Sequence, residues 1–265
     1  MAHLDCSFYS PSLKKNAHVI VFLPSVSADD FLEDREIHYE DAGKTWPTLY
    51  LLHGSYGDCL DWSLRTGIER YAQDKGVAVV MPSAENSSYV NMAQGEAYLD
   101  YIGQELPAFL RKLFPLSRKR EETYIAGLSM GGYGAFRIAL EFPDTFGYAA
   151  ALSGGLDMAA LQTSTEAHAQ KMPASYKAAV FPDVTKIAGT RDDLPTLLKA
   201  QLDAGKQLPQ LYMTCGTEDF IFPTNETFYN AAKALGVEPV YEKHPGIHDW
   251  NFWDTHIQDV LRWLP

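Results

Sequence analysis

One stretch, residues 123–142, constrains the fold of this chain more than any other. It opens with Thr-Tyr-Ile-Ala at 123–126, which is short, mostly apolar and β-branched at two positions, as expected of a buried parallel strand. A Gly-x-Ser-x-Gly follows at once, with Ser129 at its centre. The residues after it have a helical pattern that ends before Pro143. The stretch therefore predicts a strand, a sharp glycine-flanked turn that carries Ser129, and a helix.

This order has a chemical reason. A nucleophilic serine must project from the sheet on a turn too tight for side chains on its neighbours, and glycines two positions before and after it leave that room. The helix behind the turn directs backbone N–H groups and its positive dipole end toward the space beside the hydroxyl. The alternative is a helix-start loop packed tightly by glycines. Because the motif lies between a strand and a helix, we interpret Ser129 as a nucleophile.

The rest of the chain alternates between the two kinds of element. Further strands are predicted at 18–24, 48–52, 77–82, 148–153, 210–215 and 239–243, with helices at 62–76, 98–113, 224–235 and 250–264. Such alternation predicts an α/β fold with a mostly parallel central sheet and helices on both faces. Residues 156–206 break the rhythm and are expected to form a small helical excursion over the sheet. No linker or repeat is visible, so residues 1–265 are expected to form one domain.

Composition limits the partners. The net charge of -12 and a sequence pI near 5.0 argue against nucleic acid and anionic membrane surfaces as partners. The N-terminal residues lack a signal-peptide pattern, and no apolar run approaches the roughly 18 residues of a membrane helix. Cys6, Cys59 and Cys215 form neither a disulfide framework nor a metal pattern. We expect a cytoplasmic protein that acts on a small-molecule ester and needs no cofactor and no metal. The sequence does not decide between a monomer and a homo-oligomer.

The acidic residues of the 25–45 connection have a plain interpretation. They lack the spacing of cation ligands, so a solvated loop is expected there rather than a cation site. The residues concerned are Asp29, Asp30, Glu33, Asp34 and Glu36.

A serine nucleophile needs a base to take its proton, and that base needs an acid to orient it. Of the eight histidines, only His53, His244 and His248 follow predicted strands, at the sheet edge where parallel-sheet enzymes build their sites. His248 lies deeper in its loop, behind Gly246, so that it can reach back over the sheet. His244 lies at the end of its strand. We therefore prefer His248 as the base and expect His53 to brace the turn that contains it.

The acid is expected after the strand that precedes the histidine's own strand, because the chain order in this architecture is serine, acid, histidine. Glu218 and Asp219 both lie there. Asp219 is preferred, since the turn opened by Gly216 should direct it toward the histidine, and Glu218 is expected to be a solvated loop residue. The candidate triad is Ser129, Asp219 and His248.

Two further groups complete the predicted site. The backbone N–H groups of Ser55 and Met130 are expected to form an oxyanion hole, although an ordinary strand-to-helix turn at 53–58 is the alternative. Aromatic side chains near these loops are candidates for a substrate pocket, while most aromatic residues are simply core. The pocket candidates are Trp62, Tyr89 and Trp250, with Phe252 and Trp253 beside them.

Four motifs together resemble the esterase D-like esterase family, and within it the short-chain tributyrin or acetyl esterases. They are Leu-Leu-His-Gly at 51–54, Tyr-x-Asp-Tyr-Ile-x-x-Glu-Leu-Pro at 98–107, Gly-Leu-Ser-Met-Gly-Gly-Tyr-Gly at 127–134 and Gly-x-His-x-Trp-x-x-Trp at 246–253. The resemblance implies an α/β-hydrolase fold, hydrolysis of carboxylic esters without a cofactor, and the same triad. The motifs are specific for fold and nucleophile, and weakly specific for substrate.

The leading hypothesis is a serine carboxylesterase that cleaves short acyl esters, acetyl to butyryl and acetylated carbohydrates included, through an acyl-enzyme. Within the resembled family, a feruloyl or cinnamoyl esterase, an S-formylglutathione hydrolase and an acyltransferase are the alternatives. The tail with Trp250 and Trp253 looks less like the S-formylglutathione hydrolases than like the others. Outside enzymes, the alternative is a binding module that keeps the fold without catalysis.

Overall fold

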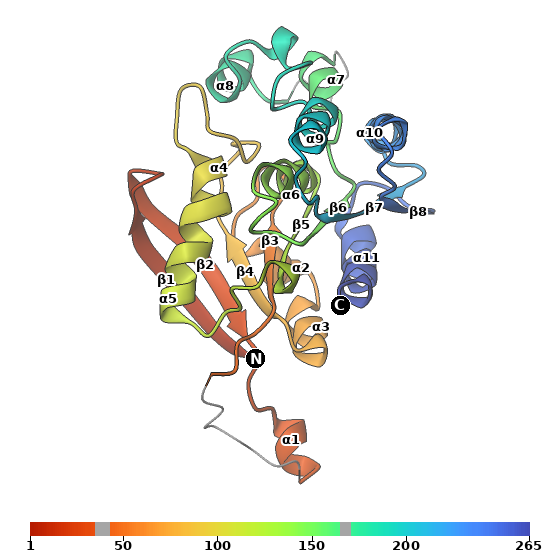
Figure 1. Ribbon diagram of the computed structural model, residues 1–265. Helices are drawn as coiled ribbons and strands as arrows, with labels where there is room; N and C mark the ends of the chain where they lie inside the picture. The colour runs from red at the N-terminus through yellow and green to blue at the C-terminus, as the bar shows by residue number, and fades with distance from the viewer. Residues whose placement is uncertain (35–42, 165–170) are drawn as a thin grey trace.

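An eight-stranded sheet runs through the centre of the structure in the order β1-β2-β4-β3-β5-β6-β7-β8 (Figure 1). The computed structural model describes residues 1–34, 43–164 and 171–265. The strands from β3 onward pair in parallel, whereas β2 pairs antiparallel with both β1 and β4. The strands are β1 (Ala2–Ser10), β2 (Lys15–Leu23), β3 (Thr48–Leu52), β4 (Ala78–Pro82), β5 (Thr123–Leu128), β6 (Tyr148–Leu152), β7 (Gln210–Gly216) and β8 (Val240–His244).

Helices connect the strands. The α-helices are α1 (Ala28–Leu32), α2 (Asp61–Arg65), α3 (Ile68–Lys75), α4 (Tyr98–Asp100), α5 (Leu106–Leu113), α6 (Met130–Glu141), α7 (Met158–Thr163), α8 (Ala174–Val180), α9 (Leu194–Asp203), α10 (Phe222–Ala234) and α11 (Trp250–Trp263). A π-helical turn, Tyr101–Glu105, joins α4 to α5, and short 3-10 turns occur at Arg120–Glu122 and Val184–Lys186. The single helix expected at 98–113 therefore has a wider turn in its middle.

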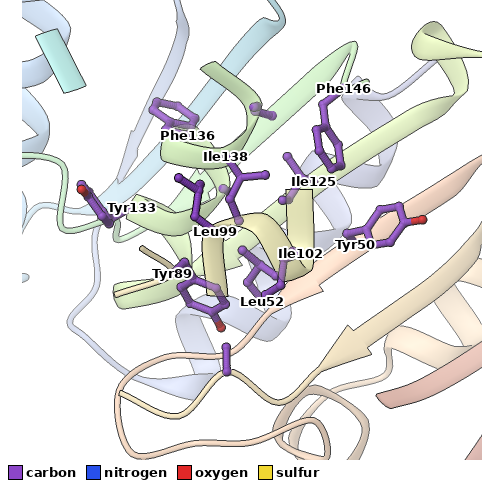
Figure 2. Close-up of a cluster of buried hydrophobic side chains, with 14 of the residues drawn as sticks. Tyr50, Leu52, Tyr89, Leu99, Ile102, Ile125, Tyr133, Phe136, Ile138 and Phe146 are labelled. Carbon is purple, nitrogen blue, oxygen red and sulfur yellow. The ribbon is translucent and has the colours of Figure 1, made fainter. Parts of the chain in front are cut away.

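The sheet has a hydrophobic core on each face. In β3, Tyr50 and Leu52 point into one core while Leu49 and Leu51 point into the other, as the two-residue period of a strand requires. The first core is covered by α4, α5, α6, α9 and α10, and Figure 2 shows part of it around Tyr50, Leu52 and Phe136. The second core is covered by α2, α3 and α11. The predicted α/β class, with helices on both faces of a mostly parallel sheet, is confirmed.

The N-terminal strand β1 is absent from the elements expected from sequence. Its residues alternate between exposed and half-buried, and the segment contains Asp5, Cys6 and Ser7. An edge strand with one solvated face lacks the continuous apolar run that marks a buried parallel strand. Because β1 forms the edge, the predicted strand at 18–24 becomes β2, one position inside it.

Residues 156–206 form the expected helical excursion, as far as they are described. The segment holds α7, α8 and α9, which lie together at one end of the molecule in Figure 1. Leu194, Leu197 and Leu198 of α9 are buried in the core that α6 also lines. Residues 165–170 lie outside the described part. So does part of the acidic connection, residues 35–42 with Glu36; α1 occupies the beginning of that connection.

Candidate active site

Ser129 lies on the turn between β5 and α6, with φ of 54° and ψ of −115°. A positive φ is costly for a residue with a Cβ, so neighbouring groups must hold it. The Ser129 N–H donates to the carbonyl of Leu152 in β6 at 3.0 Å. The Ser129 carbonyl accepts hydrogen bonds from the N–H groups of Gly132 and Gly155, each at 3.1 Å. The backbone therefore fixes where the Ser129 hydroxyl points.

Gly127 and Gly131 allow this turn to pack against the end of β3. A Cβ at Gly127 would lie 2.5 Å from the carbonyl group of Gly131. A Cβ at Gly131 would lie 2.5 Å from the Leu52 carbonyl oxygen and 2.6 Å from that of His53. These neighbours are backbone atoms, which cannot move aside as a flexible side chain can. Both glycines are needed for the close approach that brings Ser129 beside the turn after β3.

The three predicted polar side chains meet at the carboxyl ends of β5, β7 and β8. Nε2 of His248 lies 3.0 Å from Oγ of Ser129. Nδ1 of His248 lies 3.0 and 2.9 Å from the two carboxylate oxygens of Asp219. In this geometry the imidazole can take the serine proton at Nε2 while the carboxylate stabilises the resulting positive charge at Nδ1.

Asp219 is held firmly in place. Its side chain is fully buried, and one carboxylate oxygen also accepts the backbone N–H of Ile221 at 3.0 Å. His248 packs between the rings of Trp253, at 4.9 Å, and Phe220, at 4.7 Å between centroids. The imidazole therefore has little freedom to turn away from Ser129.

Glu218 links the two loops that carry Asp219 and His248. Its Oε2 accepts the Gly246 N–H at 2.7 Å, and its own N–H donates to the Gly246 carbonyl at 3.1 Å. The bond from Gly246 is the main reason that the pKa of the Glu218 carboxyl lies below its usual value. Glu218 is exposed, as expected of a loop residue, but nothing in the sequence indicates this link.

His53 braces the turn after β3. Its Nε2 accepts the backbone N–H of Ala84 at 2.9 Å, so the proton of the neutral ring is on Nδ1, which donates to the Gly54 carbonyl at 2.7 Å. Burial lowers the pKa of His53 and so favours this neutral form. The His53 carbonyl accepts the Tyr89 hydroxyl at 2.9 Å. These bonds fix the backbone that leads into Ser55.

A cavity of about 410 Å³ opens beside Ser129 and His248. Ser55 and Met130 also line it, and within the described residues neither of their backbone N–H groups donates to another protein group. Apolar side chains form much of the remaining wall. They are Leu128, Met158, Leu161, Met172, Phe220, Ile221, Trp250 and Trp253, with Lys171, Lys177 and Gln162 among the polar ones.

The pocket prediction needs correction for two of its three residues. Trp250 lines the cavity, and so does its neighbour Trp253. Trp62 is instead buried, donating Nε1–H to the Leu52 carbonyl at 2.9 Å and packing edge-on against Trp250. Tyr89 is fully buried and holds His53. Both are core residues whose polar atoms have partners inside the protein.

Two other features differ from the sequence reasoning. The wall formed by α7, α8 and Lys171–Met172 was missed, because residues 158–177 show no periodic apolar pattern. Phe252, a weaker pocket candidate, packs on His256 at 4.2 Å between ring centroids instead of lining the cavity. His244, the second candidate for the base, ends β8 and also stacks on His256.

Comparison with known proteins agrees with this arrangement. Residues 10–264 match the model of the family described as "Putative esterase". An acetyl esterase of Caldicellulosiruptor saccharolyticus is 35% identical over 266 residues, which cover 100% of this chain and 98% of that protein.

Two solved structures from Staphylococcus aureus are similar over the whole chain. A substrate-bound, fluorophosphonate-binding serine hydrolase has 32% identity and a TM-score of 0.89, covering 99% of this chain and 98% of the other. An S-formylglutathione hydrolase without ligand has 32% identity and a TM-score of 0.82, with the same coverage. The chain therefore belongs to the family described as "Putative esterase", and it is a hydrolase of carboxylic ester bonds with the α/β-hydrolase fold.

Proposed function

We propose that this protein hydrolyses esters of short-chain acids, acetyl to butyryl, through a covalent acyl-enzyme on Ser129. One observation carries the proposal. The Ser129 hydroxyl lies 3.0 Å from Nε2 of His248, whose Nδ1 meets the buried Asp219 carboxylate at 2.9 Å, and the serine and histidine line an open cavity. Esters bound in that cavity would lie against the nucleophile.

The reaction divides into two halves. Oγ of Ser129 attacks the acyl carbon while Nε2 of His248 takes its proton, and the bond to the leaving alcohol breaks as His248 returns that proton to the alcohol oxygen. A water molecule then attacks the acyl-enzyme, again losing its proton to His248. The acid is released, and Ser129 recovers its hydrogen. Asp219 holds the imidazole and stabilises its charged form in both halves.

The backbone N–H groups of Ser55 and Met130 are proposed to bind the developing oxyanion. Both residues line the cavity beside Ser129, and neither N–H donates to another group among the described residues. Met130 is also the first residue of α6, where the helix dipole favours negative charge. Donors held in place before the reaction stabilise the transition state without reorganising.

The size and lining of the cavity favour small apolar acyl groups. The cavity volume of about 410 Å³ lies toward the lower end of the roughly 300–1,000 Å³ that is usual for ligand pockets. Met158, Leu161 and Trp250 offer apolar surface to an alkyl chain. The acetyl esterase relative, 35% identical over the whole chain, supports a short acyl group.

A thioester with an anionic leaving group is the second candidate. Lys171 and Lys177 also line the cavity and would attract negative charge on the leaving group. The similar S-formylglutathione hydrolase supports this candidate. A feruloyl esterase and an acyltransferase remain as alternatives that the same substrate panel separates.

We further propose a single catalytic domain, residues 1–265, in the cytoplasm, acting on a small-molecule ester. The single sheet to which β1 through β8 all belong supports one domain. Cys6, Cys59 and Cys215 are unpaired, as is usual for proteins in a reducing compartment. In the described part of the chain no helix has the length and apolar character required to span a bilayer.

A substrate panel tests the proposal. The rate constant kcat/KM is measured for p-nitrophenyl acetate, butyrate and octanoate, for methyl ferulate and for S-formylglutathione, each with the protein and with Ser129→Ala. We expect kcat/KM for acetate or butyrate to exceed that for octanoate by about tenfold or more, because a longer acyl chain extends beyond the apolar surface of the cavity. A preference for octanoate or ferulate contradicts the short-chain proposal. Faster release of acyl product to added alcohols than to water would indicate an acyltransferase.

The lysines separate the second candidate from the first. If a thioester with an anionic thiol is the substrate, Lys177→Gln lowers kcat/KM for S-formylglutathione and leaves p-nitrophenyl acetate unchanged. Lys112→Gln, which changes a lysine of α5 outside the cavity lining, is the matched control.

A further inference from the structure

A second group of chemically versatile side chains lies where the end of β8 meets α11. His244 is the last residue of β8, and His256 and Asp259 are three positions apart on α11, so that the two project from one side of the helix. None of the three lines the cavity beside Ser129. The ester chemistry described above makes no use of them.

The three side chains already converge. One ligand atom from each of His244, His256 and Asp259 lies within 4.8 Å of the others, the one such group of metal-binding side chains in the described residues. The two imidazole rings stack, with centroids 4.2 Å apart and planes 19° apart. Nδ1 of His256 lies 2.6 Å from Oδ2 of Asp259.

The surroundings hold these groups in place. His256 is only 8% exposed, and the Phe252 ring packs against it at 4.2 Å between centroids. Arg262 pairs with Oδ1 of Asp259, which leaves Oδ2 facing the histidines. Packing and pairing already order these side chains. The entropy lost when they bind an ion is therefore small.

Negative charge gathers around the imidazoles. Oε2 of Glu242 lies 3.4 Å from Nε2 of His244, and it accepts the Tyr212 hydroxyl at 2.7 Å. Two carboxylates, Asp259 and Glu242, therefore flank two stacked imidazoles. Arg262 offsets part of the charge of Asp259, and the remaining negative charge favours a divalent cation beside the imidazoles.

We propose that His244, His256 and Asp259 bind a divalent transition-metal ion, with Zn²⁺ as the ion best matched to the ligands. Two imidazole nitrogens and one carboxylate oxygen suit Zn²⁺ and its neighbours, while Mg²⁺ and Ca²⁺ prefer oxygen ligands alone. Three protein ligands would leave a fourth position for water, and the Glu242 carboxylate lies next to His244. The sequence gives no sign of this site, because His244 and His256 come from different elements and their spacing matches no zinc motif.

Binding requires small shifts of these side chains. Ligand atoms about 2.0–2.2 Å from a tetrahedral zinc ion lie roughly 3.4 Å from one another, which is within the 4.8 Å that encloses the three atoms here but wider than the 2.6 Å between Nδ1 of His256 and Oδ2 of Asp259. Asp259 would exchange its hydrogen bond with His256 for a bond to the ion. Any proton on the nitrogens that coordinate is released to solvent.

The ion would join β8 to α11, the two elements that flank the loop with His248. The backbone carbonyl of His244 also accepts the Thr217 N–H at 2.9 Å, two residues before Asp219. A ligand that binds the folded chain and not the unfolded one stabilises the fold. The site is therefore assigned a stabilising role at the base of the two loops, and the ester chemistry proceeds without it.

Zinc titration of the complete chain tests the proposal. The protein is dialysed against EDTA and then against buffer, and ZnCl₂ is added while binding is followed by calorimetry and unfolding by thermal denaturation. We expect one equivalent of Zn²⁺ to bind and the Tm to rise. His244→Gln and Asp259→Asn should each weaken binding at least about tenfold and remove the rise in Tm, since loss of a ligand costs no less than loss of its supporting hydrogen bond.

Two variants serve as controls. His18→Gln removes a histidine that pairs with Asp5 at 2.6 Å elsewhere on the sheet, and it should bind Zn²⁺ like the unaltered protein. Ser129→Ala should also bind normally, which separates this site from the nucleophile. His244 is partly exposed at the end of an edge strand, so its variant should fold even if the buried His256→Gln does not. No rise in Tm with the unaltered protein, or equal binding by His244→Gln, overturns the proposal.

Discussion

Glu218 and Gly246 exchange two hydrogen bonds between the loops that follow β7 and β8, one through the Glu218 carboxylate at 2.7 Å and one through its N–H at 3.1 Å. Asp219 is the next residue on the first loop, and His248 lies two residues farther on the second. These two hydrogen bonds hold the loops together next to Asp219 and His248 and so set the separation of the two residues. Glu218 would therefore help to align the histidine without touching Ser129.

Replacing Glu218 should impair catalysis without unfolding the protein. In Glu218→Ala the acceptor for the Gly246 N–H is lost, His248 gains freedom, and kcat is expected to fall by roughly tenfold, since small misplacements of a catalytic group are costly. Glu238→Ala, another exposed glutamate, is the matched control and should leave kcat unchanged. Both are measured with p-nitrophenyl acetate, alongside Tm. An unchanged kcat in Glu218→Ala would show that the loops are aligned without this link.

Asp219→Asn should reduce kcat by on the order of 10⁴, the loss that the same change causes in the well-studied serine protease triad. The Asn amide oxygen can still accept the Ile221 N–H, so the loop should keep its shape. What changes is the charge beside Nδ1 of His248, and with it the orientation and stability of the imidazolium. Far-ultraviolet circular dichroism checks the fold. A loss below tenfold with the fold intact would argue against Asp219 as the acid.

Gly131→Ala should destabilise the fold and reduce activity. The added Cβ would lie 2.5 Å from the Leu52 carbonyl oxygen, so the first turn of α6 must move away from β3. Overpacking of this kind costs about 1–3 kcal/mol in free energy of unfolding. Gly189→Ala is the comparison, because its Cβ would meet no atom within 4 Å and only its φ of 80° opposes the change. Urea denaturation and esterase rates distinguish the two, since Gly189→Ala should keep full activity.

The buried His53 predicts a loss of stability in acid. Its pKa is lowered by burial in the folded state, while the unfolded chain takes up the proton near the ordinary value of about 6.5. Between the two values the unfolded state binds more protons, so stability rises with pH in that window and is lost as pH falls below about 6.5.

The comparison is between His53→Gln and the unaltered protein, each measured as Tm from pH 7.5 to pH 5. Gln can accept the Ala84 N–H but takes up no proton, so its Tm should fall less steeply with acid. Equal slopes for the two proteins would mean that His53 does not contribute.

The features that the sequence predicts correctly are those that local pattern and chain order decide. The strand, turn and helix around Ser129 follow from a strand-like run, two glycines and a helical period. His248 and Asp219 could be predicted because parallel strands end at one edge of the sheet, so residues far apart in sequence arrive together. Glycine spacing likewise predicted a turn around Ser129 too tight for side chains on the flanking positions.

Other features depend on tertiary packing that no local pattern encodes. Trp62 and Tyr89 are aromatic residues near the loops of the active site. Residue type does not distinguish a side chain that lines the cavity from one that is buried in the core beside it. Met158 and Leu161 line the cavity from a segment without periodicity. The stacking of His244 on His256 depends on how β8 packs against α11, and the exposed edge strand β1 has too little apolar character to be recognised.

The central claim is that Ser129 is the nucleophile that carries the acyl group. Its most direct test is mass spectrometry of the protein after reaction with a fluorophosphonate, run beside Ser129→Ala and hydrolysis of p-nitrophenyl acetate. We predict one adduct, located on Ser129, with both the adduct and esterase activity lost in Ser129→Ala. An adduct on another residue, or hydrolysis by Ser129→Ala at the original rate, would contradict the account, and the absence of any adduct would favour a binding module that keeps the fold without catalysis.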